Sequence, residues 1–299
     1  MKNRDELIDD LLTLAFAEDV GDGDATTLST IPDTETGKQQ LIVKEEGILA
    51  GVDIARKVFE KFDPELRMTV YIEDGAHVKP GDIAFVVEGT VRSLLQTERI
   101  MLNIMQRMSG VVTMTDRYQS RLAGLLTKVL DTRKTTPGMR ILEKEAVKIG
   151  GGSNHRIGLF DMILIKDNHV DFAGGIPQAV EAAKHWCKSN GKDLQIELEV
   201  RNEDEIRQAL EAGVDRIMLD NFTPERTKKA VEMIRAYKAP EERLKADKHS
   251  HNGTDTEIES SGGITLETLR DYGECGVDFI SVGALTHSVK GLDMSFKAC

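Results

Sequence analysis

Apolar residues follow a helical rhythm through the first part of the chain, interrupted by shorter strand-like stretches. The predicted helices cover residues 5–18, 52–62 and 93–122. The predicted strands cover residues 39–50 and 66–72. Pro80-Gly81-Asp82 is a predicted turn between two short strands within 73–88, and Ser109-Gly110 is a candidate break inside the long helix.

After Leu125 the pattern changes to short apolar runs that alternate with helical segments. The predicted strands are 127–131, 162–165, 194–199, 215–219, 257–260 and 278–282. The predicted helices between them are 138–149, 176–189, 203–212, 223–237 and 265–272. Alternating strands and helices imply a parallel sheet with right-handed crossovers. Six strands fall short of eight, so the pattern favours an incomplete α/β barrel and leaves a doubly wound sheet as the alternative.

Polar and glycine residues stand at the end of each predicted strand. They are Thr132, Arg133 and Lys134, then Lys166, Glu199, Asp220, Ser261-Gly262-Gly263 and Gly283. The carboxyl ends of parallel strands share one edge, where barrels and open sheets both place their active sites. The repeated placement of polar and glycine residues after predicted strands is the strongest indication of a functional site in the sequence.

Charge is distributed unevenly, which narrows the class of ligand. The whole chain has a formal net charge of −12, but residues 131–170 hold seven Lys or Arg against five Asp or Glu, a net charge of +2. An acidic protein with a local basic cluster favours a small anionic substrate and argues against nucleic acid. No apolar run is long enough to span a membrane, and the charged start MKNRDELIDDLL is unlike a secretory signal. Three cysteines without metal spacing fit reduced thiols, so we expect a cytoplasmic protein.

Two carboxylates and two glycine turns add chemistry to the basic cluster. Glu199 and Asp220 either pair with Arg133 or Lys166 as structural ion pairs, or act on a substrate. In the second case they would hold Mg²⁺ or stabilise positive charge that develops on the substrate. The Ser261–Gly263 turn, predicted to open a helix at Thr265, and Gly283 resemble the phosphate site of barrels.

Three motifs occur in order within forty residues: DTRKT from Asp131, SNHR from Ser153 and IKDNH from Ile165. With AEDVGDGDATT at 17–27 and LDMSF at 292–296, the chain resembles the quinolinate phosphoribosyltransferases, or carboxylating nicotinate-nucleotide pyrophosphorylases, over nearly its whole length. The resemblance implies an N-terminal α/β sandwich domain followed by an open seven-stranded α/β barrel. We therefore expect domains at 1–114 and 115–288, with the segment 289–299 returning to the N-terminal domain.

The resemblance also implies a reaction and a set of residues. Quinolinate and phosphoribosyl pyrophosphate would give nicotinate mononucleotide, pyrophosphate and CO2, a step of NAD biosynthesis, with Mg²⁺ bound by Glu199 and Asp220. The implied catalytic residues are Glu199, Asp220, Lys134 and Lys166. The implied quinolinate site comprises Arg99, Thr132, Arg133, His155, Arg156 and Lys166. The implied phosphoribosyl pyrophosphate site comprises Lys134, Lys166, Glu199, Asp220, Ser261, Gly262, Gly263, Gly283, Ala284 and Leu285.

In the resembled family the residue matching Arg99 acts in the partner subunit's site. This implies a homodimer, or a higher oligomer of dimers, that takes small-molecule substrates and neither nucleic acid nor a membrane. One alternative is a related group, the molybdenum-transport-associated pyrophosphorylase-like proteins, acting on another small anion. A second is a carrier module with Lys79 near the hairpin turn. The charged segment 238–256 is interpreted as an exposed insertion.

Overall fold

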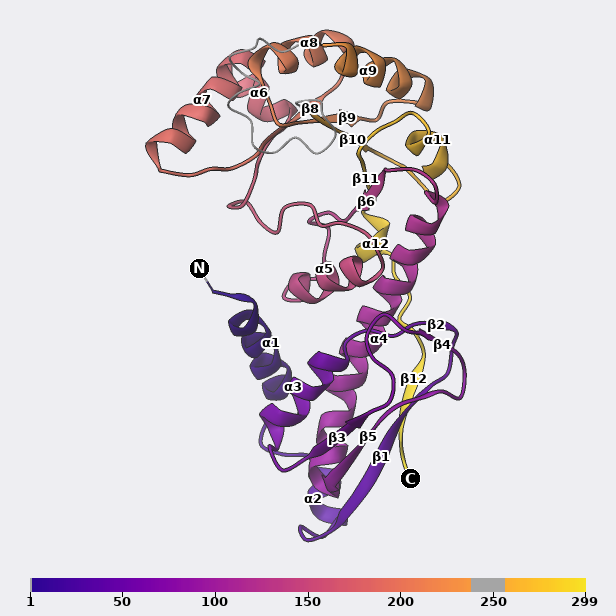
Figure 1. Cartoon of the computed structure of the whole chain (residues 1–299). Helices are drawn as coiled ribbons and strands as arrows, with labels where there is room; N and C mark the ends of the chain where they lie inside the picture. Colours follow the sequence, from indigo (N-terminus) through magenta and orange to yellow (C-terminus); the bar gives the residue numbers. More distant parts are fainter. Residues whose placement is uncertain (1, 238–255) are drawn as a thin grey trace. The chain divides into compact units, whose positions relative to one another are not determined.

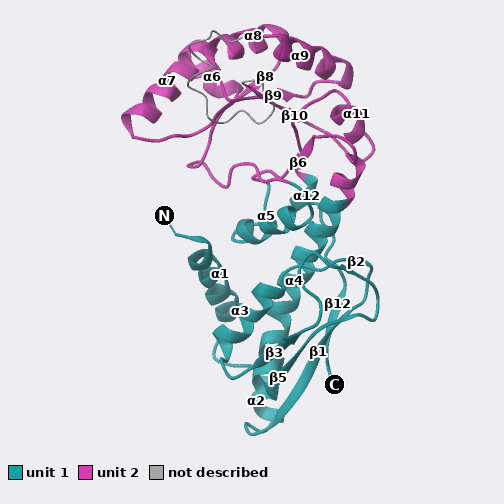
Figure 2. Ribbon diagram, in the orientation of Figure 1, with its two compact units in different colours: residues 1–116, 134–152, 284–299 teal, residues 117–133, 153–283 magenta. Residues whose placement is uncertain are grey.

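The computed structural model describes residues 2–237 and 256–299, which form two compact units (Figures 1 and 2). Unit 1 contains the chain up to Asp116, then Lys134–Gly152 and Ala284–Cys299. Unit 2 contains Arg117–Arg133 and Ser153–Gly283. Unit 1 thus includes 134–152, a segment that the sequence analysis assigned to the catalytic domain. The predicted insertion lies outside the described residues except for Thr256.

Unit 1 is built on a four-stranded antiparallel sheet of strand order β12-β1-β5-β3. Its strands are β1 (Thr36–Val43), β3 (Arg67–Val70), β5 (Ile83–Thr90) and β12 (Met294–Ala298), and a small second sheet pairs β2 (Gly47–Ile48) with β4 (His77–Val78). Its helices are α1 (Arg4–Asp19), α2 (Ala25–Thr30), α3 (Val52–Phe62), α4 (Val91–Arg121, whose last turn belongs to unit 2), α5 (Arg140–Ile149) and α12 (Ala284–His287).

The core of unit 1 is aromatic. In the sheet, Leu41 of β1 pairs with Phe85 on one side and with Phe296 on the other. Phe59 of α3 completes the group, with ring centroids 6.2 Å from Phe85 and 6.0 Å from Phe296. All four side chains are buried. Removing this apolar surface from water ties the sheet to α3 and the C-terminal strand to the N-terminal ones.

Two sequence expectations for unit 1 are corrected. Ser109-Gly110 does not break the long helix, because Ser109 Oγ bonds the backbone of Ala50 and so uses its polar group inside the packed core. At Gly110 a Cβ would lie 2.3 Å from the carbonyl oxygen of Lys290, so glycine here permits close packing of the chain. The stretch 73–88 is not a hairpin, since β4 pairs with β2 while β5 pairs with β1 and β3. That pairing removes the structural basis for the carrier alternative.

Unit 2 is a six-stranded, wholly parallel sheet of order β6-β11-β10-β9-β8-β7. Its strands are β6 (Lys128–Leu130), β7 (Ile163–Ile165), β8 (Ile196–Val200), β9 (Arg216–Asp220), β10 (Glu257–Ser261) and β11 (Phe279–Ser281). Its helices are α6 (Asp167–Ala173), α7 (Ile176–Ser189), α8 (Glu203–Ala212), α9 (Pro224–Ala236) and α11 (Leu269–Gly273). These are the six predicted strands, and the sheet is that of an open α/β barrel.

The edge strands β6 and β7 do not pair with each other, and an isolated parallel bridge joins Leu130 to Ser153 beside β6. The segment from Ser153 therefore occupies a further position alongside the sheet through a single bridge. Figure 1 shows α7, α8 and α9 along one side of this sheet.

Side chains on β8, β9 and β10 alternate strictly between the two faces of the sheet. One face carries apolar residues such as Leu198, Ile217 and Ile258, each fully buried. The other carries the set that we call the charged face: Glu197, Glu199, Arg216, Asp220, Glu257 and Glu259. The strand register aligns this set, because Glu197 pairs with Arg216 and Arg216 pairs with Glu257.

Candidate active site

The predicted residues of unit 2 follow the carboxyl ends of its strands. Arg133 comes three residues after the end of β6, Lys166 directly follows β7, and Asp220 and Ser261 are the last residues of β9 and β10. Glu199 pairs with Met218, two residues before Asp220, so both carboxylates belong to the charged face. The structure thus brings the predicted acids of unit 2 to one face and one edge of its sheet.

Lys166 and Glu199 form an ion pair, with Nζ 2.6 Å from Oε2. The Glu199 side chain is 10% exposed and that of Lys166 is 47% exposed, so the ammonium group reaches solvent from this edge. Helix α6, which the sequence analysis did not predict, begins at the next residue, and the Lys166 N–H donates to His169 Nδ1 at 2.9 Å. This contact fixes the backbone from which the lysine side chain extends.

Asp131 holds the loop that contains the SNHR motif. Its Oδ1 accepts the backbone N–H of His155 at 2.9 Å, and its other carboxylate oxygen accepts the side-chain amide of Asn154. The backbone adds two further bonds, from Ser153 N–H to Val129 O and from Asp131 N–H to Ser153 O. Because Asp131 is fully buried, these contacts anchor residues 153–155 firmly beside the end of β6.

Arg156 is half-buried, and one Nη donates to the carbonyl of Met162 at 3.2 Å. Burial lowers the pKa of Arg156, and the nearby positive charge of Arg133 lowers it further. The guanidinium stays charged even so, because its ordinary pKa is far above neutrality. Glu197 and Asp161 also lie near enough to favour the charged form of Arg156. A guanidinium group can donate two parallel hydrogen bonds to one carboxylate. A ligand with two carboxylates can therefore offer one to each of the two arginines.

A buried cluster of charged groups lies on the charged face of unit 2. His155 Nε2 is 2.9 Å from Glu197 Oε2 and 3.6 Å from Glu259 Oε2. His155 Nδ1 accepts the N–H of Arg156 at 2.7 Å, so the neutral ring carries its proton on Nε2, toward the acids. On the same face Arg216 binds Glu257 at 2.7 Å and lies 3.4 Å from Glu259. Every member is buried or nearly so.

Electrostatics in this cluster follow from burial. Desolvation, then the neighbouring charge of Glu197, raises the pKa of Glu259 to about 8. Desolvation also raises the pKa of Glu197. For Arg216, burial favours the neutral form, but the three surrounding glutamates outweigh it and raise the pKa. Glu259 therefore holds a proton at neutral pH, which reduces the charge that the cluster must bury.

The ligating atoms of His155, Glu197 and Glu259 all lie within 4.8 Å of one another, a spacing compatible with a metal ion. Arg216 already supplies positive charge to the same acids, which disfavours a second cation there. The sequence analysis missed these acids and Arg216. Their signal was the alternation of charged and apolar residues in the segments IELEV and RIMLD.

The sequence-predicted residues of unit 1 include Lys134, which is exposed. Thr286 Oγ1 donates to the Lys134 carbonyl at 2.9 Å, and Thr136 N–H donates to Glu143 Oε2 at 3.1 Å. Glu143 is fully buried and is bound by Arg107 at 2.8 Å. These contacts fix the backbone that carries Lys134. Ala284 and Leu285, also predicted, begin the short helix α12.

Arg99 lies on α4 with its side chain exposed. Within residues 2–237 and 256–299 it has no hydrogen-bond or ion-pair partner. The charge is available to a ligand or to another chain.

The two predicted glycine turns differ in their surroundings. Gly283 directly precedes α12, as expected. The helix predicted over 265–272 is present as α11, but its predicted start at Thr265 is wrong, because α11 begins at Leu269 and residues 266–268 form a turn. Backbone N–H groups of the Ser261–Gly263 segment, rather than a helix N-terminus, would therefore meet a phosphate there.

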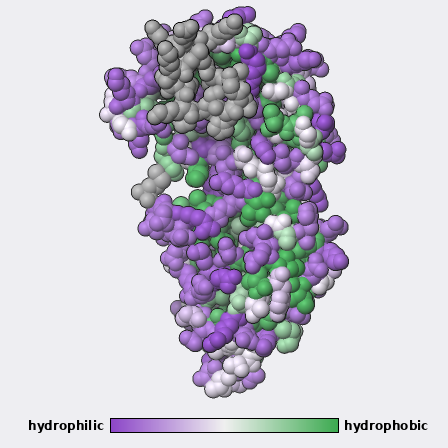
Figure 3. All heavy atoms as spheres, in the orientation of Figure 1, coloured by the Kyte–Doolittle hydropathy of each residue, from purple (hydrophilic) through white to green (hydrophobic). Residues whose placement is uncertain are grey.

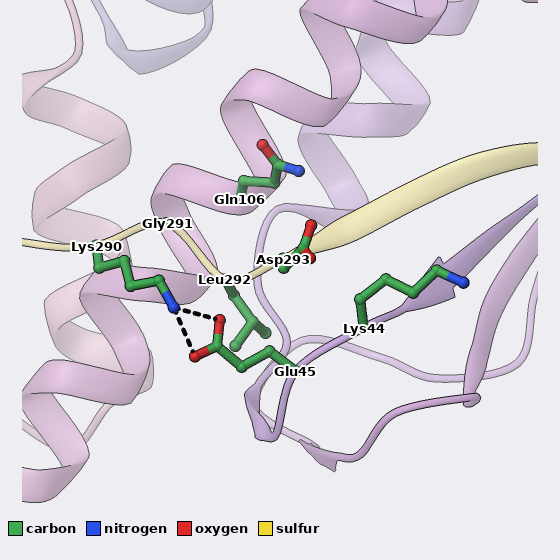
Figure 4. Close-up of a pocket in the computed structure, with 7 residues that line it drawn as sticks. All are labelled: Lys44, Glu45, Gln106, Lys290, Gly291, Leu292 and Asp293. Atoms are coloured by element: carbon green, nitrogen blue, oxygen red, sulfur yellow. Dashed lines mark hydrogen bonds and ion pairs between the residues drawn. The ribbon is translucent and has the colours of Figure 1, made fainter.

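A pocket in unit 1 contains none of the predicted site residues (Figure 4). It is lined by Lys44, Glu45, Gln106, Lys290, Gly291, Leu292 and Asp293. Lys290 Nζ donates to both carboxylate oxygens of Glu45, at 2.9 and 3.1 Å, while Lys44 extends away from this pair. Figure 3 shows that the face drawn is largely hydrophilic around smaller apolar areas. Since its main cation is already paired, this pocket has little to offer an anion.

No helix among the described residues has the length and hydropathy needed to cross a membrane.

Comparison with known proteins identifies the family of this chain. The models of the quinolinate phosphoribosyl transferase N-terminal and C-terminal domains match residues 24–109 and 111–297. The chloroplastic nicotinate-nucleotide pyrophosphorylase [carboxylating] of Arabidopsis thaliana is 42% identical over 96% of this chain and 81% of its own length.

Two further relatives agree. The probable nicotinate-nucleotide pyrophosphorylase [carboxylating] of Bacillus subtilis (strain 168) is 39% identical over 95% of this chain and 91% of its own. The solved structure of the nicotinate-nucleotide pyrophosphorylase from Francisella tularensis, 37% identical, matches with a TM-score of 0.87 over 100% of this chain and 98% of that one. The chain belongs to the quinolinate phosphoribosyltransferase family.

Proposed function

We propose that this protein transfers the phosphoribosyl group of phosphoribosyl pyrophosphate to quinolinate with loss of CO2, giving nicotinate mononucleotide and pyrophosphate. The relatives above are named as carboxylating nicotinate-nucleotide pyrophosphorylases, which is the same reaction written in reverse. The alternative of a molybdenum-transport-associated paralogue is not favoured by these relatives.

The observation that carries the proposal is the pair Arg133 and Arg156 at the carboxyl edge of unit 2. Arg156 is held by the Asp131-anchored loop; burial lowers its pKa, and the positive charge of Arg133 lowers it further. Two planar guanidinium groups match the two carboxylates of a pyridine dicarboxylate better than the single carboxylate of nicotinate. Lys166 lies along the same edge. We assign quinolinate to this cluster, with Thr132 and His155 supporting it.

The chemistry requires little covalent help from the protein. The ring nitrogen forms a bond to the anomeric carbon of ribose while the bond to pyrophosphate breaks, and pyrophosphate takes the electron pair. The nitrogen is then positively charged, so the adjacent carbon can hold the electron pair left when CO2 departs. That carbon next takes a proton from solvent. The protein's task is to hold the two substrates in line and to stabilise charge in the transition state.

We propose that Glu199 and Asp220 also hold Mg²⁺. Their carboxylate oxygens are the ligands that Mg²⁺ prefers, and both belong to the charged face at the edge of the sheet. When bound, the ion would neutralise part of the charge on phosphoribosyl pyrophosphate. The ammonium group of Lys166 occupies one oxygen of Glu199, so lysine and metal would share that carboxylate.

The test is an assay of the purified protein with phosphoribosyl pyrophosphate, Mg²⁺ and either quinolinate or nicotinate. We expect nicotinate mononucleotide from quinolinate and at least tenfold lower kcat/KM with nicotinate, which has one carboxylate fewer to bind. Equal turnover of nicotinate would overturn the assignment of the two guanidinium groups to two carboxylates.

We further propose that Arg99 completes the site of a partner subunit in a two-fold symmetric dimer, as the family resemblance implies. Its exposed and unpartnered position among the described residues supports such a role. Mixing the inactive variants Arg99→Ala and Lys166→Ala tests it. With shared sites, about half of the dimers are mixed and each has one intact site, so roughly a quarter of wild-type activity returns. If no activity returns after subunit exchange has been shown with labelled chains, each site is built within one chain.

A further inference from the structure

We propose that Asn221 is a positioning residue that holds the carboxylate of Asp220 in the orientation needed to bind phosphoribosyl pyrophosphate and its metal. The inference rests on the proposed function and adds a residue outside the predicted site. It stands on three observations: the backbone conformation of Asn221, its hydrogen bond to Asp220, and the close approach of Gly262.

Asn221 follows β9 and has a backbone φ of 55°, in the left-handed region. It is the one non-glycine residue with positive φ among those that the structure describes. Asparagine adopts this conformation more readily than most residues, but glycine adopts it at lower cost. The Asn221 N–H donates to Ser261 O at 2.9 Å, which locks the turn to the neighbouring strand β10. An asparagine where glycine would fit more easily indicates a use for its side chain.

The side chain of Asn221 is directed to the carboxylate before it. Its Nδ2 donates to Asp220 Oδ2 at 2.7 Å. An ionised carboxylate only accepts hydrogen bonds, so the amide nitrogen, and not the amide oxygen, must face Asp220. One oxygen of Asp220 is thereby held by the protein. The other, Oδ1, has no hydrogen-bond partner in the part of the chain that the structure describes, and it can meet a ligand.

Gly262 leaves the space that the Asn221 amide occupies. A Cβ at residue 262 would lie 2.2 Å from Asn221 Oδ1 and 3.0 Å from its backbone nitrogen. Gly262 also has φ +100°, a conformation that favours glycine. Because Ser261 pairs with Asp220 in the parallel register, this glycine lies directly beside the turn. The absence of a side chain at 262 therefore makes room for the Asn221 amide over the strand end.

The arrangement restrains the rotation of the Asp220 side chain before any ligand binds. A free carboxylate at a strand end samples several rotamers, and ordering it costs binding energy. Without the hydrogen bond from Asn221, ordering the Asp220 side chain would weaken the binding of phosphoribosyl pyrophosphate with Mg²⁺. Quinolinate, which the proposed function assigns to Arg133 and Arg156, should not be affected.

Two variants separate this role from a purely structural one. Asn221→Gly keeps the positive φ and removes the amide. Asn221→Asp keeps the size and shape but replaces the donor with a charge that repels Asp220. We expect the dissociation constant of phosphoribosyl pyrophosphate with Mg²⁺, measured by calorimetry, to rise roughly tenfold in the first and more in the second. Quinolinate affinity and the melting temperature should stay near those of the wild type.

A residue needed only for the turn would behave differently, because glycine and aspartate both tolerate the left-handed conformation. Wild-type affinity for phosphoribosyl pyrophosphate in Asn221→Gly would therefore overturn the proposal, whatever Asn221→Asp does. Equal losses for both substrates would do the same, since they would indicate general damage to the edge of the sheet. The matched control is Asn202→Gly, which removes an exposed asparagine that caps α8 in the same unit and should leave both affinities unchanged.

Calorimetry keeps this test separate from the proposed function. If the wild-type protein binds phosphoribosyl pyrophosphate but does not turn over quinolinate, the proposed reaction fails and the role of Asn221 can still be measured. If turnover is normal and the Asn221 variants bind phosphoribosyl pyrophosphate like the wild type, the proposed reaction is supported and the positioning role of Asn221 is overturned.

Discussion

The sheet of unit 1 packs phenylalanine side chains against α3, whereas the sheet of unit 2 buries glutamate, arginine and histidine on its charged face. In unit 1, Phe59, Phe85 and Phe296 stabilise the fold through apolar surface removed from water. In unit 2, Glu197, Glu259 and Arg216 are equally inaccessible, yet they lose strong hydration when they are buried.

Unit 1 gains stability by burying apolar side chains, whereas unit 2 loses some stability by burying charged ones. A buried ion cluster is rarely more stable than apolar residues of the same volume, so it indicates a function for which the cost is accepted. In unit 2 the cluster lies on the same face as Glu199 and Asp220 and is linked to Arg156 through His155. We interpret it as the rigid support of the site at the strand ends.

The largest effect on stability should come from leaving the buried acids without their cation. Arg216→Met should lower the free energy of unfolding by about 3–5 kcal/mol, because Glu257 and Glu259 would stay buried without the arginine that pairs with them. Phe85→Ala in unit 1 should cost a similar ~3–5 kcal/mol through its cavity. Urea unfolding at pH 5.5 and pH 8.5 distinguishes them. The Arg216→Met loss should shrink at acid pH, while that of Phe85→Ala should not change; the same loss at both pH values for both variants would contradict the comparison.

The next largest effect is expected on catalysis, from substitution of the two acids at the edge of the charged face. Glu199→Gln and Asp220→Asn should each lower kcat by roughly a hundredfold if they stabilise charge in the transition state. Quinolinate affinity should change much less, because we assign that substrate to Arg133 and Arg156. Steady-state rates and calorimetric quinolinate affinity are measured on the same preparations. Lost quinolinate affinity with normal turnover at saturation would show that these acids are misplaced.

A smaller effect is expected in the pH dependence of stability. Burial raises the pKa of Glu259 to about 8, whereas the unfolded carboxyl has a pKa near 4.5. Between these values the folded state binds a proton that the unfolded state releases, so the free energy of unfolding should fall as the pH rises. The fall from pH 6 to pH 8 should be on the order of 2 kcal/mol. Glu259→Gln, which cannot ionise, should lack this component, and an unchanged slope in that variant would refute the raised pKa.

The smallest effect should be at the exposed pair Lys290–Glu45 in Figure 4. The Lys290 side chain is 80% exposed, so water and salt screen the interaction. Lys290→Ala should change the free energy of unfolding by less than about 0.5 kcal/mol. A loss above about 1 kcal/mol in urea titration would mean that exposed and buried ion pairs differ less here than burial suggests.

The sequence allowed much of this to be predicted, for physical reasons that vary by residue. Apolar runs of strand length gave the six strands of unit 2, and the polar residues after them placed Lys166 and Asp220 at the carboxyl edge. Helix α6 was missed because it starts at Asp167, with only Lys166 between it and the end of β7. The break expected at Ser109-Gly110 was wrong because Ala50, distant in sequence, satisfies the serine.

The buried cluster was missed for a different reason. Charged residues are almost never fully buried, so the alternation of Glu197 and Arg216 with apolar neighbours does not by itself predict a buried charged cluster. Only the strand register, which the sequence does not contain, brings Glu197 beside Arg216 and both near Glu259. The position of Asn221 beside Asp220 also depends on this register, through Ser261 and Gly262.

The central claim is that the charges of unit 2 serve a phosphoribosyl transfer coupled to loss of a carboxylate. The most direct measurement uses quinolinate labelled with ¹³C in the carboxylate next to the ring nitrogen, incubated with phosphoribosyl pyrophosphate, Mg²⁺ and the purified protein. We expect one labelled CO2 for each nicotinate mononucleotide formed and no label in the nucleotide. A nucleotide that retains the label, or CO2 released without nucleotide, would contradict the claim.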